Sequence, residues 1–305
     1  MSSLPTETTT ATRLAQPIRA GVARDYVQLA KPRVASLVLA TTAAGFYLGA
    51  VGTIEPILLL HVLIATALVA TAANALNQLD ERDTDARMRR TRNRPLPAGR
   101  MTPGDVLRFG VATGVAGMLY AAVSVNLLTS LLLAVTLAGY VFAYTPLKRR
   151  TPLSTVVGAV PGALPPLIGW AAARDGLGES AWVLFAILFL WQLPHFLAIA
   201  WIYRDDYARA GLPLLTVIDP TGRAAAGQTL LYSAALLPVS LAPTLTGLAG
   251  VTYFAAAFVL SGVFLGFGVR MARTLSLASA RDLFRYSVIY LPLLLAAMMI
   301  DKIVQ

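Results

Sequence analysis

Long apolar segments alternate with short polar connections along almost the whole chain. A helix needs about 20 apolar residues to cross the hydrocarbon core of a bilayer. On that length the pattern predicts nine transmembrane helices, and therefore an all-α, polytopic membrane protein with no inserted soluble domain. The predicted helices cover residues 34–52, 57–79, 105–124, 127–145, 153–172, 181–202, 224–245, 249–269 and 284–301.

The connections alternate in charge. Those after the second, fourth, sixth and eighth predicted helices are rich in Lys and Arg, whereas the other four carry a single cation, Arg174. Of the 25 Lys and Arg residues, all but Arg174 and Lys302 fall on one side. Because cations gather on the cytoplasmic side, we expect a multi-pass protein of the inner (plasma) membrane, with its N-terminus in the cytoplasm and its C-terminus outside.

Residues 1–24 are polar and lack the apolar core of a secretory signal peptide. We predict a disordered cytoplasmic tail there, with a short organellar transit peptide as the alternative. Residues 25–305 are predicted to form one transmembrane domain. It begins with an interfacial segment in which Tyr26 and Lys31 lie at headgroup depth.

Composition narrows the chemistry. The 305 residues are 57% hydrophobic and 13% charged, whereas a soluble domain has about 25% charged residues. The chain contains no cysteine, which excludes disulfides, thiolate metal sites and cysteine nucleophiles. The net charge of +10 lies mainly in the connections between apolar segments. It therefore indicates topology signals and phosphate ligands, not nucleic acid.

The first connection rich in cations begins with regularly spaced oxygen ligands. Asn77, Glu81 and Asp85 recur every fourth residue, so on a helix they share one face. Two carboxylates and an amide oxygen suit Mg²⁺, which takes its other ligands from water and substrate phosphates. The pattern favours a metal–diphosphate site over an ordinary charged loop, because a loop needs no such spacing.

Arginines follow immediately. Two prolines in this segment predict an extended loop of fixed shape. Arginine binds phosphate bidentately, so we expect a phosphate clamp, with topology-determining charge as the alternative. The arginines assigned to the clamp are Arg90, Arg92, Arg94 and Arg100.

A second basic motif ends the fourth predicted helix. Tyr144 is followed by Lys148 and Arg149. From spacing alone, the two cations either extend to lipid headgroups or reach the same diphosphate. The next predicted helix, over residues 153–172, contains three glycines and three prolines between residues 158 and 169. It is expected to be broken beside a cavity or to pack closely against its neighbours.

His195 lies within a predicted helix, where an ionisable residue usually faces the interior or a cavity. A hydrogen-bonded structural role is the alternative. The helix leads into a second acidic connection, made of Tyr203, Arg204, Asp205 and Asp206. The two acidic connections lie four helices apart, which weakly indicates a parallel duplication with both facing one cavity.

Together these motifs resemble the UbiA superfamily of intramembrane prenyltransferases, and within it the branch whose acceptor is haem. The resemblance covers residues 25 to about 300. One motif departs from the superfamily pattern, since the second acidic connection reads YRDDY and not D-x-x-x-D, which puts a second full metal shell in doubt. The matching segments are residues 25–34, 77–100, 144–149, 158–170 and 191–215.

The resemblance implies transfer of farnesyl from farnesyl diphosphate to a vinyl group of haem b, giving haem O and pyrophosphate for terminal oxidases. It implies helices around a central cavity, with Mg²⁺ on the oxygen ligands and Lys148 and Arg149 stabilising the departing pyrophosphate. Tyr144, His195 and the residues of the YRDD segment would bind substrate. Beyond the lipid bilayer, haem A synthase and oxidase assembly factors are the expected partners.

Two other functions fit parts of the pattern. A UbiA-type enzyme acting on an aromatic or quinone precursor would be expected to carry D-x-x-x-D in the second acidic connection. A transporter would explain the broken helix and a repeat. It would normally place coupling acids near the middle of the membrane, whereas every carboxylate of this chain is predicted in a tail, a loop or a helix end.

Overall fold

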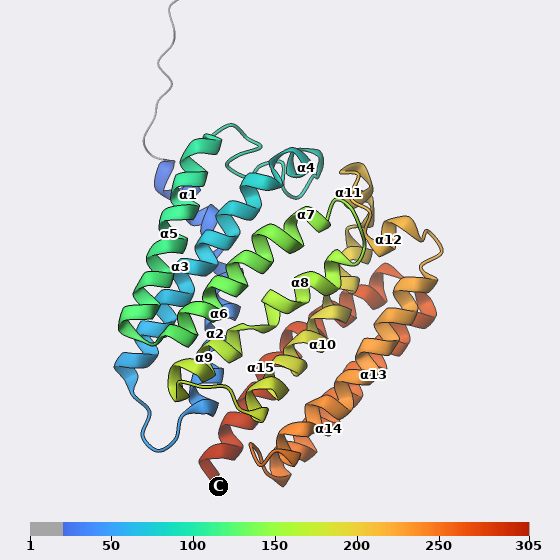
Figure 1. Ribbon diagram of the computed structural model, residues 1–305. Coiled ribbons are helices and arrows are strands. Elements are labelled where there is room, and N and C mark those ends of the chain that lie inside the picture. Colours follow the sequence, from blue (N-terminus) through green and yellow to red (C-terminus); the bar gives the residue numbers. More distant parts are fainter. Residues whose placement is uncertain (1–20, 305) are drawn as a thin grey trace, which may run out of the picture.

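The computed structural model describes residues 21–304, which form a bundle of long helices and contain no strand (Figure 1). Most of the predicted tail 1–24 lies outside the described residues, and its last three residues already belong to α1. The helices are α1 Val22–Ala30, α2 Pro32–Gly49, α3 Pro56–Asp80, α4 Arg82–Arg87, α5 Pro103–Ser124, α6 Leu127–Ala138, the π-helix η1 Gly139–Tyr144, α7 Thr145–Leu147, α8 Ser154–Ala163, α9 Pro165–Arg174, α10 Glu179–Ile202, α11 Arg204–Arg209, α12 Leu215–Ile218, α13 Arg223–Leu245, α14 Val251–Thr274 and α15 Leu277–Val304.

Eight of the nine predicted transmembrane helices meet the length and composition needed to cross a membrane in the described part of the chain. The first corresponds to α2, which is 18 residues long and begins with Pro32 and Arg33. These two residues lower its apolar character, so the ninth crossing stays a prediction. The described chain starts at the end of the bundle that carries α4 and α11, and its C-terminus lies at the opposite end (Figure 1).

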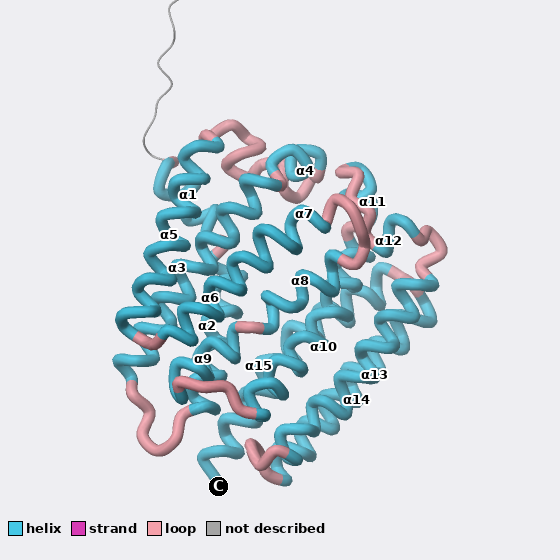
Figure 2. The backbone as a smooth tube through the Cα atoms, in the orientation of Figure 1, coloured by secondary structure: helices cyan, strands magenta, loops and turns pink. Residues whose placement is uncertain are grey.

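The glycine- and proline-rich helix is broken, and it also packs closely. Leu164 separates α8 from α9, and Figure 2 shows this break in the middle of the bundle. On α9, a Cβ atom added at Gly169 would lie 1.9 Å from the Thr42 carbonyl oxygen of α2. Helices can approach this closely only where small residues form the contact. The expected break and the expected close packing are therefore both present, whereas a cavity beside the break stays a prediction.

The C-terminal end of α2 is held by cations from distant parts of the chain. The Lys302 ammonium group on α15 donates to the carbonyl oxygens of Tyr47, Leu48 and Ala50. Arg174 donates to the carbonyl of Gly49 at 2.6 Å. The last carbonyls of a helix lack intrahelical partners and carry partial negative charge, so these two cations complete and neutralise the end of α2.

Candidate functional site

The regular oxygen spacing survives a break in the helix. α3 ends at Asp80 and α4 begins at Arg82. Glu81 nevertheless donates its backbone N–H to the Asn77 carbonyl at 2.9 Å, and Asp85 donates to the Glu81 carbonyl at 2.8 Å. These are helical bonds, so the three side chains share a face as predicted. All three are buried.

A cationic side chain lies next to each of these three oxygen-bearing side chains. Lys148 donates to Glu81 Oε1 at 2.8 Å, and Arg94 donates to Asp85 Oδ2 at 2.6 Å. Lys31 Nζ lies 3.5 Å from Asn77 Oδ1. The other carboxylate oxygen of Asp85, Oδ1, is buried and accepts no hydrogen bond from the described residues. An unpaired buried carboxylate oxygen is costly unless something else binds it.

Charge and burial oppose one another at this cluster. Burial would raise the pKa of Glu81, but the Lys148 ammonium outweighs it and lowers that pKa. At Asp85 burial prevails over Arg94, so its pKa is raised. Burial also disfavours the charged form of Lys148, yet Glu81 raises the Lys148 pKa overall. Burial, aided by Arg94, lowers the pKa of Lys31 to about 7.

Lys31 is a site residue that the sequence analysis placed elsewhere. It was expected at headgroup depth, which stays a prediction, and its ammonium group reaches Asn77. Its backbone has φ +49°, between the end of α1 and the start of α2. Pro32 follows it, and the residue before a proline is disfavoured in the right-handed helical region. The Lys-Pro pair therefore indicates in the sequence that one helix ends and the next begins here, but not that Lys31 reaches Asn77.

The arginine loop is compact, so the predicted extended conformation is wrong. Gly99 N donates to the Leu96 carbonyl at 3.0 Å, which closes a turn. Pro97 sits at the second position of this turn, where its fixed φ is preferred, and Gly99 has φ +69°. Proline here favours a turn over extension.

The four arginines of the predicted clamp have different surroundings in the structure. Arg94 holds Asp85, and the guanidinium of Arg90 lies 5.1 Å from the ring centroid of Tyr203. Arg92 is exposed. Arg100 donates to Asp25 at 2.9 Å on α1. Arg94 therefore lies at the oxygen ligands, whereas Arg100 anchors the loop away from them.

The second basic motif reaches the cluster through a π-helix. η1 ends at Tyr144, and π-helical turns occur frequently at functional sites. Lys148 points at Glu81, and Arg149 pairs with the exposed carboxylate of Asp80. A Cβ atom at Gly158 would lie 2.4 Å from the Tyr144 ring, so the glycine leaves room for that ring.

The two acidic connections meet. Met88 of the first packs in one buried cluster with Tyr207, Ala210, Leu212 and Leu214 of the second. This is consistent with both facing one cavity, and the duplication stays a prediction.

The acids of the second connection are not arranged like those of the first. Asp205 is exposed, and Asp206 pairs with Arg209 one turn away. Arg204 lies over the ring of Trp201, 5.0 Å from its centroid. Of the four residues predicted to bind substrate in this segment, Tyr203 lies against Arg90 of the first connection.

The side chain of His195 contacts α15 and not the cluster around Asn77, Glu81 and Asp85. Its Nδ1 lies 2.6 Å from Ser287 Oγ of α15, and its ring stacks against Trp191 at 5.2 Å between centroids. The next residue, Phe196, lines the cavity instead. These contacts match the structural alternative for His195.

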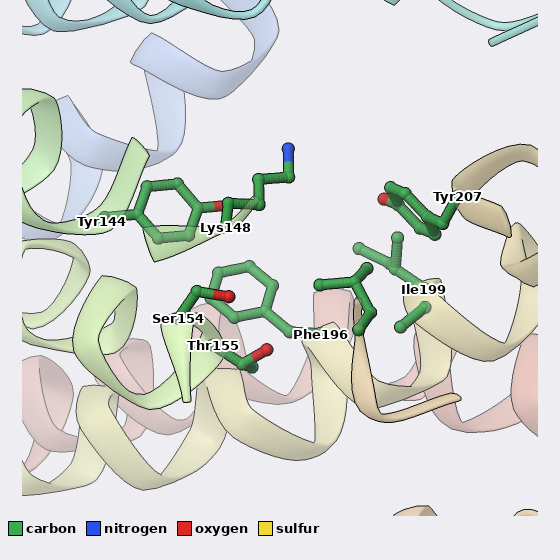
Figure 3. A pocket seen from close by; sticks show the side chains of 9 residues that line it. Tyr144, Lys148, Ser154, Thr155, Phe196, Ile199 and Tyr207 are labelled. Atoms are coloured by element: carbon green, nitrogen blue, oxygen red, sulfur yellow. The ribbon is translucent and has the colours of Figure 1, made fainter. Parts of the chain in front are cut away.

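A cavity lies beside Lys148, between α7 and α8 on one side and α10 to α12 on the other (Figure 3). The wall that carries Lys148 and α8 is polar, and the opposite wall is apolar apart from Tyr207. Such a cavity suits a molecule with a charged head and a hydrocarbon tail. Its polar residues are Tyr144, Lys148, Ser154, Thr155 and Tyr207, and its apolar residues are Phe196, Ile199, Ala200 and Leu214.

Comparison with known proteins gives a consistent result. Residues 38–291 match the model of the UbiA prenyltransferase family. The protoheme IX farnesyltransferase of Solibacter usitatus (strain Ellin6076) is 49% identical, covering 92% of this chain and 99% of the relative.

Solved structures share the fold. A digeranylgeranylglyceryl phosphate synthase has a TM-score of 0.78 at 14% identity, over 93% of this chain and 99% of that one. A UbiA homologue from Archaeoglobus fulgidus, bound to GPP and Mg²⁺, has a TM-score of 0.63 at 16% identity. The match covers 90% of this chain and 99% of the homologue.

Proposed function

The chain belongs to the UbiA prenyltransferase family, and we propose that it transfers the farnesyl group of farnesyl diphosphate to a vinyl group of haem b. The bond between farnesyl C1 and the diphosphate oxygen breaks, and its electrons leave with pyrophosphate. The vinyl group supplies the electrons of the new carbon–carbon bond. Water then adds to the resulting side-chain cation and loses a proton, which gives haem O.

One observation supports this proposal most: a helix end presents two carboxylates and an amide oxygen to three cations beside a half-apolar cavity. Arg94 and Lys148 match the two carboxylates of Glu81 and Asp85, and Lys31, whose pKa is lowered to about 7, adds a surplus positive charge when it is protonated. That surplus would stabilise a departing pyrophosphate. The apolar wall would hold the farnesyl chain and keep water from the reacting carbon.

These residues fit a bound Mg²⁺. No group of three His, Cys, Asp or Glu side chains suited to a metal occurs within residues 21–304, but Mg²⁺ commonly uses one or two carboxylates and completes its shell with water and substrate phosphates. The unpaired Oδ1 of Asp85 offers one such ligand, with Glu81 and Asn77 as the others. Mg²⁺ would supply charge neutralisation at the diphosphate oxygens.

The proposal also includes the localisation of the protein, its partners and the choice of acceptor. Residence in the inner membrane with a cytoplasmic N-terminus rests on the alternation of cations. Haem A synthase and oxidase assembly factors are proposed as partners because they would take up the product. The rival acceptor, an aromatic or quinone precursor, gains no support from the second acidic connection, where Asp205 is exposed and Asp206 is paired with Arg209.

The direct test is incubation of the purified protein with haem b, farnesyl diphosphate and Mg²⁺, followed by mass analysis of the pigment. Parallel reactions omit Mg²⁺, omit the prenyl donor, or replace haem with 4-hydroxybenzoate. We expect a haem product heavier by one farnesyl group and one hydroxyl group. Prenylation of 4-hydroxybenzoate but not of haem would replace the proposed acceptor with an aromatic one.

A further inference from the structure

Ser154 carries a buried hydroxyl group that the fold itself does not use. The residue is fully buried, and Ser154 Oγ forms no hydrogen bond with any described residue. It lines the cavity, and Figure 3 shows its hydroxyl pointing into that space next to the hydroxyl of Thr155. A buried hydroxyl without a partner costs free energy. A ligand that forms a hydrogen bond with Ser154 Oγ would remove this cost.

The surroundings of Ser154 favour an anionic ligand. Ser154 is the first residue of the ten-residue helix α8, whose start has no side-chain cap. The first backbone N–H groups of α8 already donate to carbonyls of residues 151–153, so the start of this helix offers an anion its partial positive charge but no free N–H donor. Lys148 lies on the same cavity wall, with its ammonium group bonded to Glu81. The opposite wall, with Phe196 and Ile199, is apolar apart from Tyr207, so most polar partners for an anionic group lie on the side of Ser154.

We infer that Ser154 Oγ donates a hydrogen bond to an anionic oxygen of a substrate in this cavity. The inference rests on the proposed function and adds a binding residue to it. Two substrates supply such an oxygen: the prenyl donor through its diphosphate, and haem through its carboxylates. In either case the Ser154 hydroxyl fixes the charged group on the polar wall, and the apolar part of the substrate lies along the opposite wall.

Ser233 provides a control that distinguishes ligand binding by Ser154 from an ordinary packing role. Ser233 on α13 is also fully buried and its hydroxyl is also unpaired within the described part of the chain. It lies against Gly268 of α14, where an added Cβ atom would be 2.6 Å from Ser233 Oγ. Ser233 therefore offers the same chemistry at a helix contact instead of a cavity wall. Ser154→Ala and Ser233→Ala remove the same group from the two settings.

The experiment measures thermal unfolding of the detergent-solubilised wild type and both variants, without ligand and over a titration. The first titrations use Mg²⁺ with inorganic pyrophosphate, and Mg²⁺ with farnesyl diphosphate. The next titrations use haem b and its dimethyl ester, and the binding of each is measured from the change in haem absorbance. Without ligand, neither variant should lose stability, because each loses an unpaired buried hydroxyl.

With ligand, Ser154→Ala should bind about tenfold more weakly, as expected for a lost hydrogen bond to a charged group, while Ser233→Ala should match the wild type. Weaker pyrophosphate binding would identify the diphosphate as the source. Weaker haem binding, with the dimethyl ester unaffected by the substitution, would identify a haem carboxylate.

Two results would overturn the inference. In the first, Ser154→Ala binds every ligand as the wild type does. In the second, it unfolds at a lower temperature without ligand and keeps its affinities, which would mean a structural role. A wild type that responds to none of the ligands and forms no product would instead refute the proposed function, and the inference with it.

Discussion

The ion pair between Glu81 and Lys148 allows a quantitative test of the site. Its two charged atoms are 2.8 Å apart, and the side chains are only 7% and 14% exposed. Glu81→Gln keeps the shape of the side chain and removes its charge. Lys148 is then left largely buried without its main partner.

The expected loss of stability follows from this geometry. At 2.8 Å and an effective dielectric constant of about 20, the gross attraction is about 6 kcal/mol. Removing one member of a buried pair costs about 3–5 kcal/mol in measured cases. Because the pair lies at the end of α3, where solvent reaches part of Lys148, we expect about 3 kcal/mol for Glu81→Gln.

A double-mutant cycle measures the interaction itself. The cycle compares the wild type, Glu81→Gln, Lys148→Met and the double variant by unfolding in mixed micelles. The double variant should lose clearly less stability than the two single losses together, because it contains no unpaired charge. All three variants should lose most turnover, since both groups lie in the proposed site. Asp83→Asn removes the same charge from a 76% exposed side chain and serves as the control.

Two outcomes would refute this reasoning. If the single losses add in the double variant, the pair contributes no coupling and its close contact has no energetic consequence. If the double variant regains near wild-type turnover, the two charges serve only each other, and the metal–diphosphate interpretation of Glu81 fails.

Asp85→Asn should abolish most turnover and raise the Mg²⁺ concentration needed for the remainder, because Oδ1 is proposed to bind the metal; turnover within about twofold of wild type, under ~0.5 kcal/mol of barrier, would contradict this. His195→Gln should retain turnover and the haem absorption spectrum, since Gln can still hydrogen-bond to α15; an altered spectrum would place His195 at the haem. Single cysteines at Ala98 and Gly178 test topology in a chain that has none of its own: in intact cells, a membrane-impermeant thiol reagent should label only Gly178→Cys, and labelling of Ala98→Cys alone would invert the orientation.

The parts of the site that the sequence predicted depend on local spacing. Asn77, Glu81 and Asp85 share a face because helical hydrogen bonds set that periodicity, even across the break at Glu81. The broken helix was visible for the same reason, since glycine and proline act on their own backbone. The positions of the long helices likewise follow from the length of the apolar segments.

The features that the sequence did not reveal depend on contacts between distant segments. Nothing near Lys31 shows that it will meet Asn77, 46 residues away. Arg100 and Arg94 look equivalent in the chain, yet one pairs with α1 and the other with Asp85. The direction of His195 depends on Ser287, 92 residues later. Ser154 gave no signal, because an unpaired hydroxyl is defined by what its neighbours fail to supply.

The cations at the end of α2 have a consequence for the order of synthesis. Lys302 follows Ala50, whose carbonyl it binds, by 252 residues. At about 5–20 residues per second, a ribosome needs roughly 10–50 s to cover that distance. Throughout this interval α2 is already made, but its terminal carbonyls have neither Lys302 nor the α15 surface. The end of the first long helix therefore reaches its final state only after the last helix has been inserted.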